Sequence, residues 1–286
     1  MIYRKTRYKI ILKKFIPMTA HHISAIDIHA HYGVLDRPGK PWLQRFGSCD
    51  APGVAQRAKQ SNIQITVVSP LLGLMPRGQA DACTGNEEAD QIVPTIDGLR
   101  QWVIIDPKRP ETFDQAQQML SKSHCVGIKI HPEEHLYPIV EHGQAIFEFA
   151  AKHEAVVLTH SGQENSMPED FVPFANDHPN VKLILAHIGC SCDEDLSHQV
   201  RAVQMSKHGN IFADTSSASN ILPGLIEWAV SEIGAEKVLF GTDSPLYDVP
   251  MQRARINEAD LNDHEKQIIL RDNALKLLDL KLEGYV

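Results

Sequence analysis

Two histidines separated by a single residue lie in an apolar segment near the N-terminus. Residues 26–31 read IDIHAH, and Gly33 follows them closely. Residues i and i+2 of a β-strand face the same side, so His29 and His31 are expected to project together. Neutral imidazole is the commonest metal ligand in proteins, and two rings at one strand end suit a divalent metal. For this pair taken alone, the alternative is two hydrogen-bonded structural histidines.

Later apolar segments also end in polar side chains that could take part in chemistry. These side chains are Lys129, His131, His160, His187, Asp214 and Asp243. If the segments are parallel strands of one sheet, their carboxyl ends meet at one face and the side chains converge there. Each residue taken singly is more often structural, but their convergence on one face predicts a site.

Eight short apolar segments, each followed by a helical segment, would position these residues. The apolar segments lie near 26–31, 63–69, 102–107, 126–132, 155–160, 181–187, 211–215 and 238–243. Near-continuous apolar strands that alternate with helices indicate a parallel sheet covered on both faces. Eight such units predict an α/β fold, a closed (β/α)8 TIM barrel with the metal site at the C-terminal end of the strands. An open doubly wound sheet usually has a Gly-rich turn after its first strand, where this chain has HYG.

The helical segments and connections complete this pattern. Helices are expected near 50–60, 87–100, 110–123, 139–150, 193–207, 222–233, 250–257 and 263–279, with one more ending before 178. Asp50 is expected to cap the first of them. Residues 32–50 are expected to form a long loop, which at this length is usually functional or mobile. No repeat or low-complexity linker divides the chain, so one domain over 18–286 is predicted.

Composition limits the classes of protein to which the chain can belong. Of 286 residues, 43% are hydrophobic and 22% charged, as in ordinary globular proteins. The net charge of −8 argues against a nucleic-acid partner. No apolar run reaches the roughly 18–20 residues of a membrane helix, so no membrane partner is expected. Five cysteines without a Cys-x-x-Cys pair favour a reducing, cytoplasmic location.

Residues 1–17 differ from the rest of the chain in charge. They contain six basic residues and no acidic one, with apolar residues between them. Such a segment suits a membrane surface or an extra helix, but Met18 would serve equally well as a start. Residues 1–17 are therefore predicted to be a basic N-terminal extension.

The ordered set of motifs resembles the amidohydrolase superfamily. The matching segments are DIHAH (27–31), GIKIHP (127–132), LTHSG (158–162), LAHIG (185–189), FGTDSP (240–245) and NA (273–274). They are most similar to the amidohydrolase-related branch, which includes aminocarboxymuconate semialdehyde decarboxylase, other aromatic-acid decarboxylases, lactonases and hydrolases. The resemblance covers residues 26–274 and supports the barrel fold.

The resemblance implies a ligand set for one divalent metal ion, with zinc expected and manganese as the alternative. The implied ligands are His29, His31, His160 and Asp243, a set that zinc accepts with room for a water. Asp243 would also accept a proton from that water. His187 would be the nearby histidine that does not bind the metal but acts on the substrate or the water.

Three further residues are predicted to bind an anionic substrate group. Binuclear relatives carry a carboxylated lysine at the end of strand four, which the mononuclear branch lacks. We therefore expect one metal, with Lys129 and His131 contacting the substrate. An ion pair with Glu133 is the alternative for Lys129. Arg37, in the first long loop, would favour a carboxylate-bearing substrate, although it could equally be a solvated surface residue.

The predicted function is that of a metal-dependent hydrolase. A metal-activated water would attack an amide, ester or lactone of a small carboxylate-bearing substrate. The alternative is a metal-dependent, non-oxidative decarboxylase (a carboxy-lyase) of an aromatic or unsaturated acid. A barrel that binds metal without turnover is a third hypothesis, disfavoured by the complete ligand set. The expected partner is a small-molecule substrate. The sequence leaves the oligomeric state open, with a homodimer, as many relatives form, among the alternatives.

Overall fold

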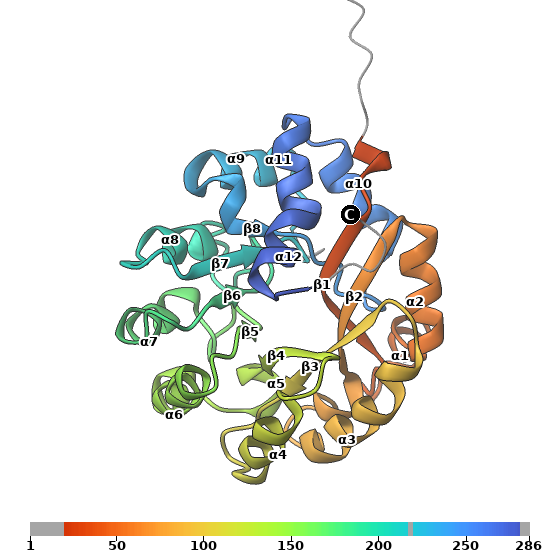
Figure 1. The fold of residues 1–286 in the computed structure, drawn as a ribbon, viewed down its shortest axis with the longest axis vertical. Coiled ribbons are helices and arrows are strands. Elements are labelled where there is room, and N and C mark those ends of the chain that lie inside the picture. The colour runs from red at the N-terminus through yellow and green to blue at the C-terminus, as the bar shows by residue number, and fades with distance from the viewer. Residues whose placement is uncertain (1–19, 217–219, 281–286) are drawn as a thin grey trace, which may run out of the picture.

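Eight parallel strands form a barrel with helices around it. The computed structural model describes residues 20–216 and 220–280, so the predicted extension at 1–17 lies outside the described residues. Each strand pairs with the next one along the chain, in the order β1 to β8 (Figure 1). The predicted (β/α)8 barrel is therefore confirmed.

The strands occupy the segments that the apolar pattern predicts. They are β1 (Ala25–Tyr32), β2 (Ile63–Pro70), β3 (Leu99–Ile104), β4 (Cys125–Ile130), β5 (Val157–Thr159), β6 (Leu183–Leu185), β7 (Ile211–Asp214) and β8 (Val238–Leu239). Strands β5, β6 and β8 are shorter than expected. After β6 and β8 the backbone leaves the extended conformation, and His187 and Asp243 adopt φ values of +72° and +55°.

The barrel closes where β1 meets the segment that follows β8. The amide N–H of Ile28 donates to the carbonyl oxygen of Phe240 at 3.0 Å, and that of Asp243 donates to His29 at 2.7 Å. A bridge between Ala30 and Ser244 continues the pairing. We call this contact between the first and last strands the β1–β8 seam.

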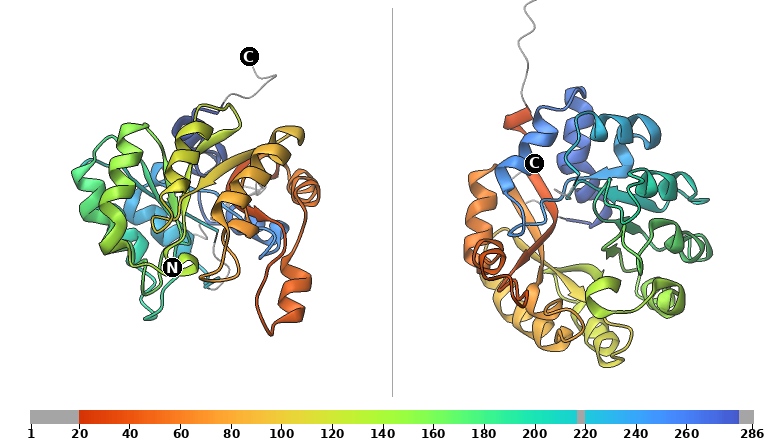
Figure 2. Two further views of the ribbon diagram at one scale, coloured as in Figure 1. Left: turned by 90° about the horizontal axis from the view of Figure 1, so that it is seen from below. Right: turned by 180° about the vertical axis from the view of Figure 1, so that it is seen from behind.

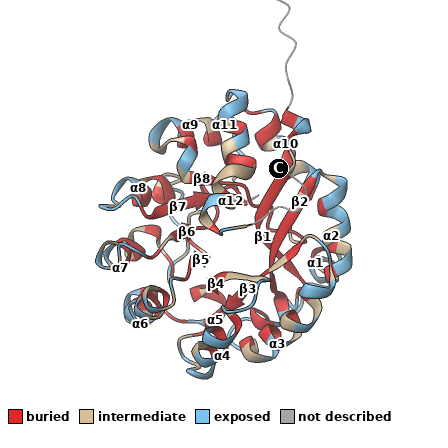
Figure 3. Cartoon of the chain, in the orientation of Figure 1, coloured by how far each residue is buried: buried red, intermediate tan, exposed pale blue. Residues whose placement is uncertain are grey.

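Helices surround the barrel, and their buried faces point toward the strands (Figure 3). They include α2 (Ala51–Gln60), α3 (Ala82–Ile92), α4 (Glu111–Met119), α6 (Ile139–Lys152), α7 (Val172–Asp177), α8 (His198–Gln204), α9 (Leu225–Ile233) and α10 (Val249–Asn257). Two short helices, α11 (Asp263–Gln267) and α12 (Asn273–Leu277), flank a π-helical segment, η6 (Ile268–Asp272). Asp50 caps α2 as predicted, because its carboxylate accepts from the N–H of Gly53 at 2.9 Å.

The prediction of a helix over 87–100 was wrong in its bounds. Helix α3 begins earlier, after its cap Asp81, and ends at Ile92. Pro94 lies in the 3₁₀ turn η3 (Val93–Thr95), and β3 already begins at Leu99. The remaining 3₁₀ turns are η1 (Ala20–His22), η2 (Leu71–Gly73), η4 (Pro168–Phe171) and η5 (Ala235–Lys237).

Two short helices lie where the sequence predicted none. Helix α1 (Pro41–Gly47) lies within the expected loop, and α5 (Pro132–His135) directly follows β4. Gly33 and Cys49 exchange two backbone hydrogen bonds at the base of the α1 segment, which projects from the barrel (Figure 2). Arg37 lies in this segment, between β1 and α1.

Apolar side chains fill the interior of the barrel. The buried cluster includes Ile26, Ile28, Ile65, Val67, Trp102, Leu158, Ile184 and Leu239, together with Ala274 of α12. The indole N–H of Trp102 donates to the carbonyl oxygen of Ile28 at 2.7 Å, so this large side chain is both packed and satisfied. Among the described helices, none has the length and apolar character needed to cross a membrane.

Candidate metal centre

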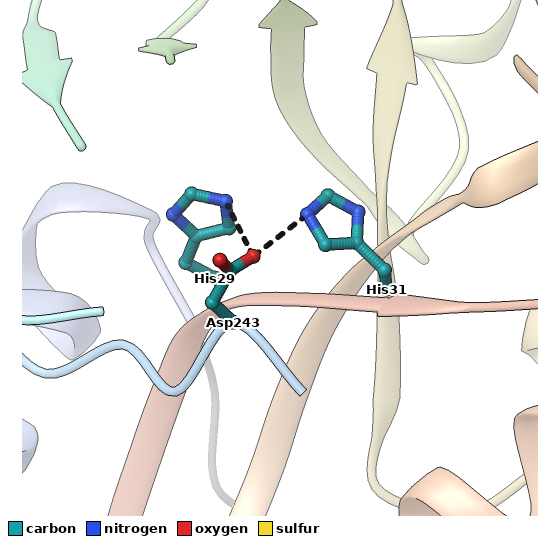
Figure 4. A group of neighbouring side chains, drawn as sticks. All are labelled: His29, His31 and Asp243. Atoms are coloured by element: carbon teal, nitrogen blue, oxygen red, sulfur yellow. Dashed lines mark ion pairs between the residues drawn. The ribbon is translucent and has the colours of Figure 1, made fainter. Parts of the chain in front are cut away.

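His29, His31 and Asp243 form a compact group at the β1–β8 seam (Figure 4). Nε2 of His31 lies 3.1 Å from Oδ1 of Asp243, and Nε2 of His29 lies 3.7 Å from the same oxygen. One potential ligand atom from each residue lies within 4.8 Å of the others. All three residues are buried, so the two nitrogens and one oxygen that could bind a metal are shielded from bulk solvent.

Hydrogen bonds on the far side of each imidazole orient these two nitrogens. Nδ1 of His29 donates to Oδ2 of Asp214 at 2.8 Å, and Nδ1 of His31 donates to the carbonyl oxygen of Ser69 at 3.1 Å. A proton fixed on Nδ1 leaves the lone pair of Nε2 directed toward the group. Metal-binding histidines usually have such a partner. The donor set therefore fits a divalent cation.

His160, the fourth ligand implied by the resemblance, makes other contacts in this structure. Its Nε2 lies 2.9 Å from Oε1 of Gln163, and its Nδ1 lies 3.1 Å from Nε2 of His187. Its ring stacks on that of His131 with the ring centroids 4.2 Å apart. His160 lines the same pocket as the group of three but does not belong to that group. Its role as a ligand stays a prediction.

Lys129 lies against the metal-facing nitrogen of His29 and does not line the pocket. Its Nζ is 2.9 Å from Nε2 of His29, and the residue is fully buried. Burial lowers the pKa of Lys129 to about 8, although Asp214 and Asp243 oppose the shift. A lowered pKa favours the uncharged amine, which would not repel a cation bound at Nε2 of His29. The alternative partner, Glu133, instead accepts from the backbone N–H of Asn165 at 2.6 Å.

His187 is held between two other polar side chains. Its Nδ1 lies 2.7 Å from Oγ of Ser216, and its Nε2 contacts His160. Burial, together with the neighbouring His29 and His160, lowers the pKa of His187 well below its ordinary value. At neutral pH the ring is therefore uncharged. Its left-handed backbone is of the kind that folds retain chiefly at functional sites, at a cost of about 1–3 kcal/mol.

Asp214 and Ser216 join His29 to His187, and the sequence alone predicted an individual role at the site for neither of them. Oδ1 of Asp214 accepts from the backbone N–H of His187 at 2.9 Å and from the hydroxyl of Ser216. Oγ of Ser216 also lies 3.1 Å from Nδ1 of His29. Asp214 was visible in the sequence as a polar strand end, whereas nothing in the sequence singled out Ser216.

The group of three opens into a pocket with both polar and apolar walls. The pocket has a volume of about 190 Å³. Its apolar lining consists of Leu71, Leu74, Met75 and Leu246, and its polar lining includes Arg37, Arg77, His131, Glu134, His160, Gln163 and His187. A cavity of ~150 Å³ can hold one benzene molecule. The pocket therefore suits a ligand with about one ring.

Burial keeps the imidazoles of His131 and His160 in the pocket in their neutral form. Burial is the main cause that lowers the pKa of His160 to about 4 and that of His131 well below its ordinary value. Burial raises the pKa of Asp243, partly offset by its hydrogen bond with His31. Neutral imidazoles are the form that binds metals.

Three solved structures share the fold over nearly the whole chain. A 2,6-dihydroxybenzoate decarboxylase from Rhizobium is 14% identical, with a TM-score of 0.68 over 90% of this chain and 98% of that one. A 5-carboxyvanillate decarboxylase from Sphingomonas paucimobilis is 12% identical, with a TM-score of 0.69 over 91% and 100%. A dihydroxybenzoic acid decarboxylase from Polaromonas sp. JS666, with bound manganese and 2-nitroresorcinol, is 13% identical, with a TM-score of 0.69 over 90% and 97%.

A comparison of the sequence with models of protein families identifies the family of this chain. No curated protein matches the chain. The sequence model of the family described as Amidohydrolase matches residues 26–280. This range includes strands β2 to β8, all of β1 except Ala25, and the group of His29, His31 and Asp243. The chain belongs to the amidohydrolase family.

Proposed function

We propose that this protein is a metal-dependent decarboxylase that acts on a small aromatic or unsaturated carboxylic acid. The observation that carries the proposal is the pocket beside His29, His31 and Asp243. It combines an apolar wall with two guanidinium groups in a volume of about 190 Å³. Such a pocket suits a ring that bears a carboxylate. The three decarboxylases of the same fold support this alternative over the hydrolase that the sequence first predicted.

The metal would be held by His29, His31 and Asp243, with His160 as a further ligand on rotation of its side chain. Three nitrogens and one oxygen suit zinc, whereas manganese is bound in one of the similar structures. When bound, a divalent cation supplies positive charge that attracts an anionic oxygen of the substrate. Metal content after purification, measured by elemental analysis, distinguishes the two ions.

The reaction needs one proton for each molecule of carbon dioxide. The bond between the ring carbon and the carboxylate breaks, its electron pair stays on the carbon, and the carbon takes up a proton. Asp243 and His187 are the two groups at the pocket suited to deliver it. Asp243 is favoured because its carboxyl group lines the pocket and can carry a proton to the substrate. His187, neutral and fixed by Ser216, would orient the substrate.

Solvent isotopes separate decarboxylation from hydrolysis. The full-length, metal-loaded protein is supplied in D₂O with hydroxybenzoates, carboxyvanillates and unsaturated acids, and in parallel with lactones, esters and amides. Decarboxylation would release carbon dioxide and place one deuterium on the product carbon. Hydrolysis in H₂¹⁸O would instead place ¹⁸O in the product. Chelator-sensitive ¹⁸O incorporation without carbon dioxide release would refute the proposal and support the hydrolase.

A further inference from the structure

A buried carboxylate at the pocket wall holds two arginines that come from different loops. Glu134 of α5 has a side chain only 2% exposed. Arg37, in the segment before α1, donates from Nη1 and Nη2 to its two oxygens at 3.1 and 2.6 Å. Arg77, in the loop after β2, donates from Nη2 to Oε1 at 2.9 Å. All three side chains line the pocket beside the metal group.

This cluster carries one more positive charge than its carboxylate can balance. A single guanidinium neutralises Glu134, and the second is surplus. Glu133 of the same short helix is a second acid that acts electrostatically on Arg77. Its carboxylate accepts two hydrogen bonds from Asn165, at 2.6 and 3.1 Å, and does not line the pocket. The wall formed by Arg37 and Arg77 therefore attracts an anion.

The two guanidinium groups also have hydrogen-bond donors to spare. Each carries five N–H donors in a fixed planar fork. Glu134 accepts two hydrogen bonds from Arg37 and one from Arg77, and the described residues provide no other acceptor for either group. The planar fork matches a carboxylate, which can accept two parallel hydrogen bonds.

We propose that Arg37, Glu134 and Arg77 form a subsite for a second carboxylate, so that the substrate is a small dicarboxylic acid. One carboxylate would lie at the metal group, and the other at the paired arginines. Glu134 acts as a positioning residue, because its buried carboxylate oxygens hold the guanidinium groups of Arg37 and Arg77 at the pocket wall. The proposal rests on the proposed decarboxylation only for the reaction, since the subsite is a statement about binding.

Binding of two matched acids to the metal-loaded, full-length protein tests the subsite without turnover. Isophthalate carries two carboxylates on its ring, whereas benzoate carries one. By isothermal titration calorimetry, the unmodified protein is expected to bind isophthalate about tenfold more tightly than benzoate, a difference of one well-formed charged contact. Arg77→Met should remove this preference and leave benzoate binding within about twofold. Arg37 still neutralises Glu134 in this variant, so the fold should persist.

Two further variants complete the experiment. Arg77→Lys keeps the positive charge but lacks the planar guanidinium group that can donate two parallel hydrogen bonds. This variant should therefore lose part of the preference for isophthalate. Arg109 provides a matched control, because it contacts Asp81 at 3.1 Å and Glu111 at 2.9 Å but does not line the pocket. Arg109→Met should leave the preference for isophthalate unchanged.

Several results would overturn the subsite. One is equal binding of the two acids by the unmodified protein, and another is an equal loss of both acids in Arg77→Met. If Arg77→Met failed to fold, an unchanged preference in Arg77→Lys would be decisive against it. Failure of the decarboxylase proposal looks different. A chain that releases no carbon dioxide but prefers isophthalate in an Arg77-dependent way would refute the reaction and support the subsite.

Discussion

The contact between Asp214 and His29 shows how one buried side chain can prepare another for a metal. Asp214 accepts the Nδ1 proton of His29 at 2.8 Å and is fully buried. Asp214→Asn would replace an acceptor-only carboxylate with an amide that can turn its N–H groups toward the ring. We expect metal affinity to fall by about 10–100-fold. Titration of the metal-free variant with Zn²⁺ or Mn²⁺ measures this change.

A control for this variant is available at another buried acid. Asp106 accepts from the backbone N–H of Lys108 at 3.1 Å and makes no contact with the metal group. Asp106→Asn should bind the metal as the unmodified protein does. Equal metal affinity in Asp214→Asn and Asp106→Asn would show that Asp214 does not orient His29.

Metal binding and catalytic turnover should be lost through different substitutions. His29→Ala combined with His31→Ala removes both Nε2 donors, so the purified protein should lose its metal. His187→Asn keeps these donors, so metal content should be unchanged while kcat falls by about 10²-fold, as on loss of a group that positions the substrate. Elemental analysis and steady-state kinetics check both results. Full metal occupancy in the double variant would remove both histidines from the site.

At the scale of elements, a charged network connects α8 to the turn η4. His198, at the start of α8, contacts Glu169 of η4 through Nδ1 at 2.8 Å and Asp193 through Nε2 at 3.0 Å. Burial alone would lower the pKa of His198, but its hydrogen bonds to Glu169 and Asp193 outweigh burial and raise it. The protonated ring therefore stabilises the fold more than the neutral ring does.

This raised pKa fixes the direction of a pH dependence. The stabilising contribution of His198 is fully present below the pKa of the unfolded chain, about 6.5, and is lost as pH rises through the folded value. The difference in unfolding free energy between the unmodified protein and His198→Gln should therefore shrink from pH 6 to pH 9. Urea unfolding at several pH values measures it. His264→Gln, at an exposed position of α11, is the control, and a difference that grows with pH would contradict the assignment.

The elements that sequence reasoning missed lie in the long connections. Helix α1 follows a Gly- and Pro-containing stretch and exposes most of its apolar side chains, so no buried stripe marks it. Arg77 and Glu134 are far apart in sequence, and only folding brings their loops together. The strand ends, in contrast, follow directly from the apolar segments. For that reason His29, His31 and Asp243 could be predicted as neighbours, whereas the side-chain orientation of His160 could not.

At the scale of the whole molecule, Trp102 fills the centre of the barrel. It is fully buried in the interior cluster and donates to the carbonyl oxygen of Ile28. Trp102→Ala would leave a large cavity and should lower the free energy of unfolding by about 3–5 kcal/mol. Trp42 of α1 is 66% exposed, so Trp42→Ala should change it by less than about 0.5 kcal/mol. Denaturant unfolding compares the two, and equal losses would show that the interior is not the main source of stability.

The β1–β8 seam has a consequence for how the protein is made. Two of the three residues proposed to hold the metal come from the first strand, and the third, Asp243, comes from the segment that follows the last strand. The ribosome synthesises His29 and His31 long before Asp243. All three residues can therefore bind one ion only after the first and last strands of the barrel have paired. Metal binding would then be the final step of folding, and the bound ion would link the first and the last strands to be synthesised.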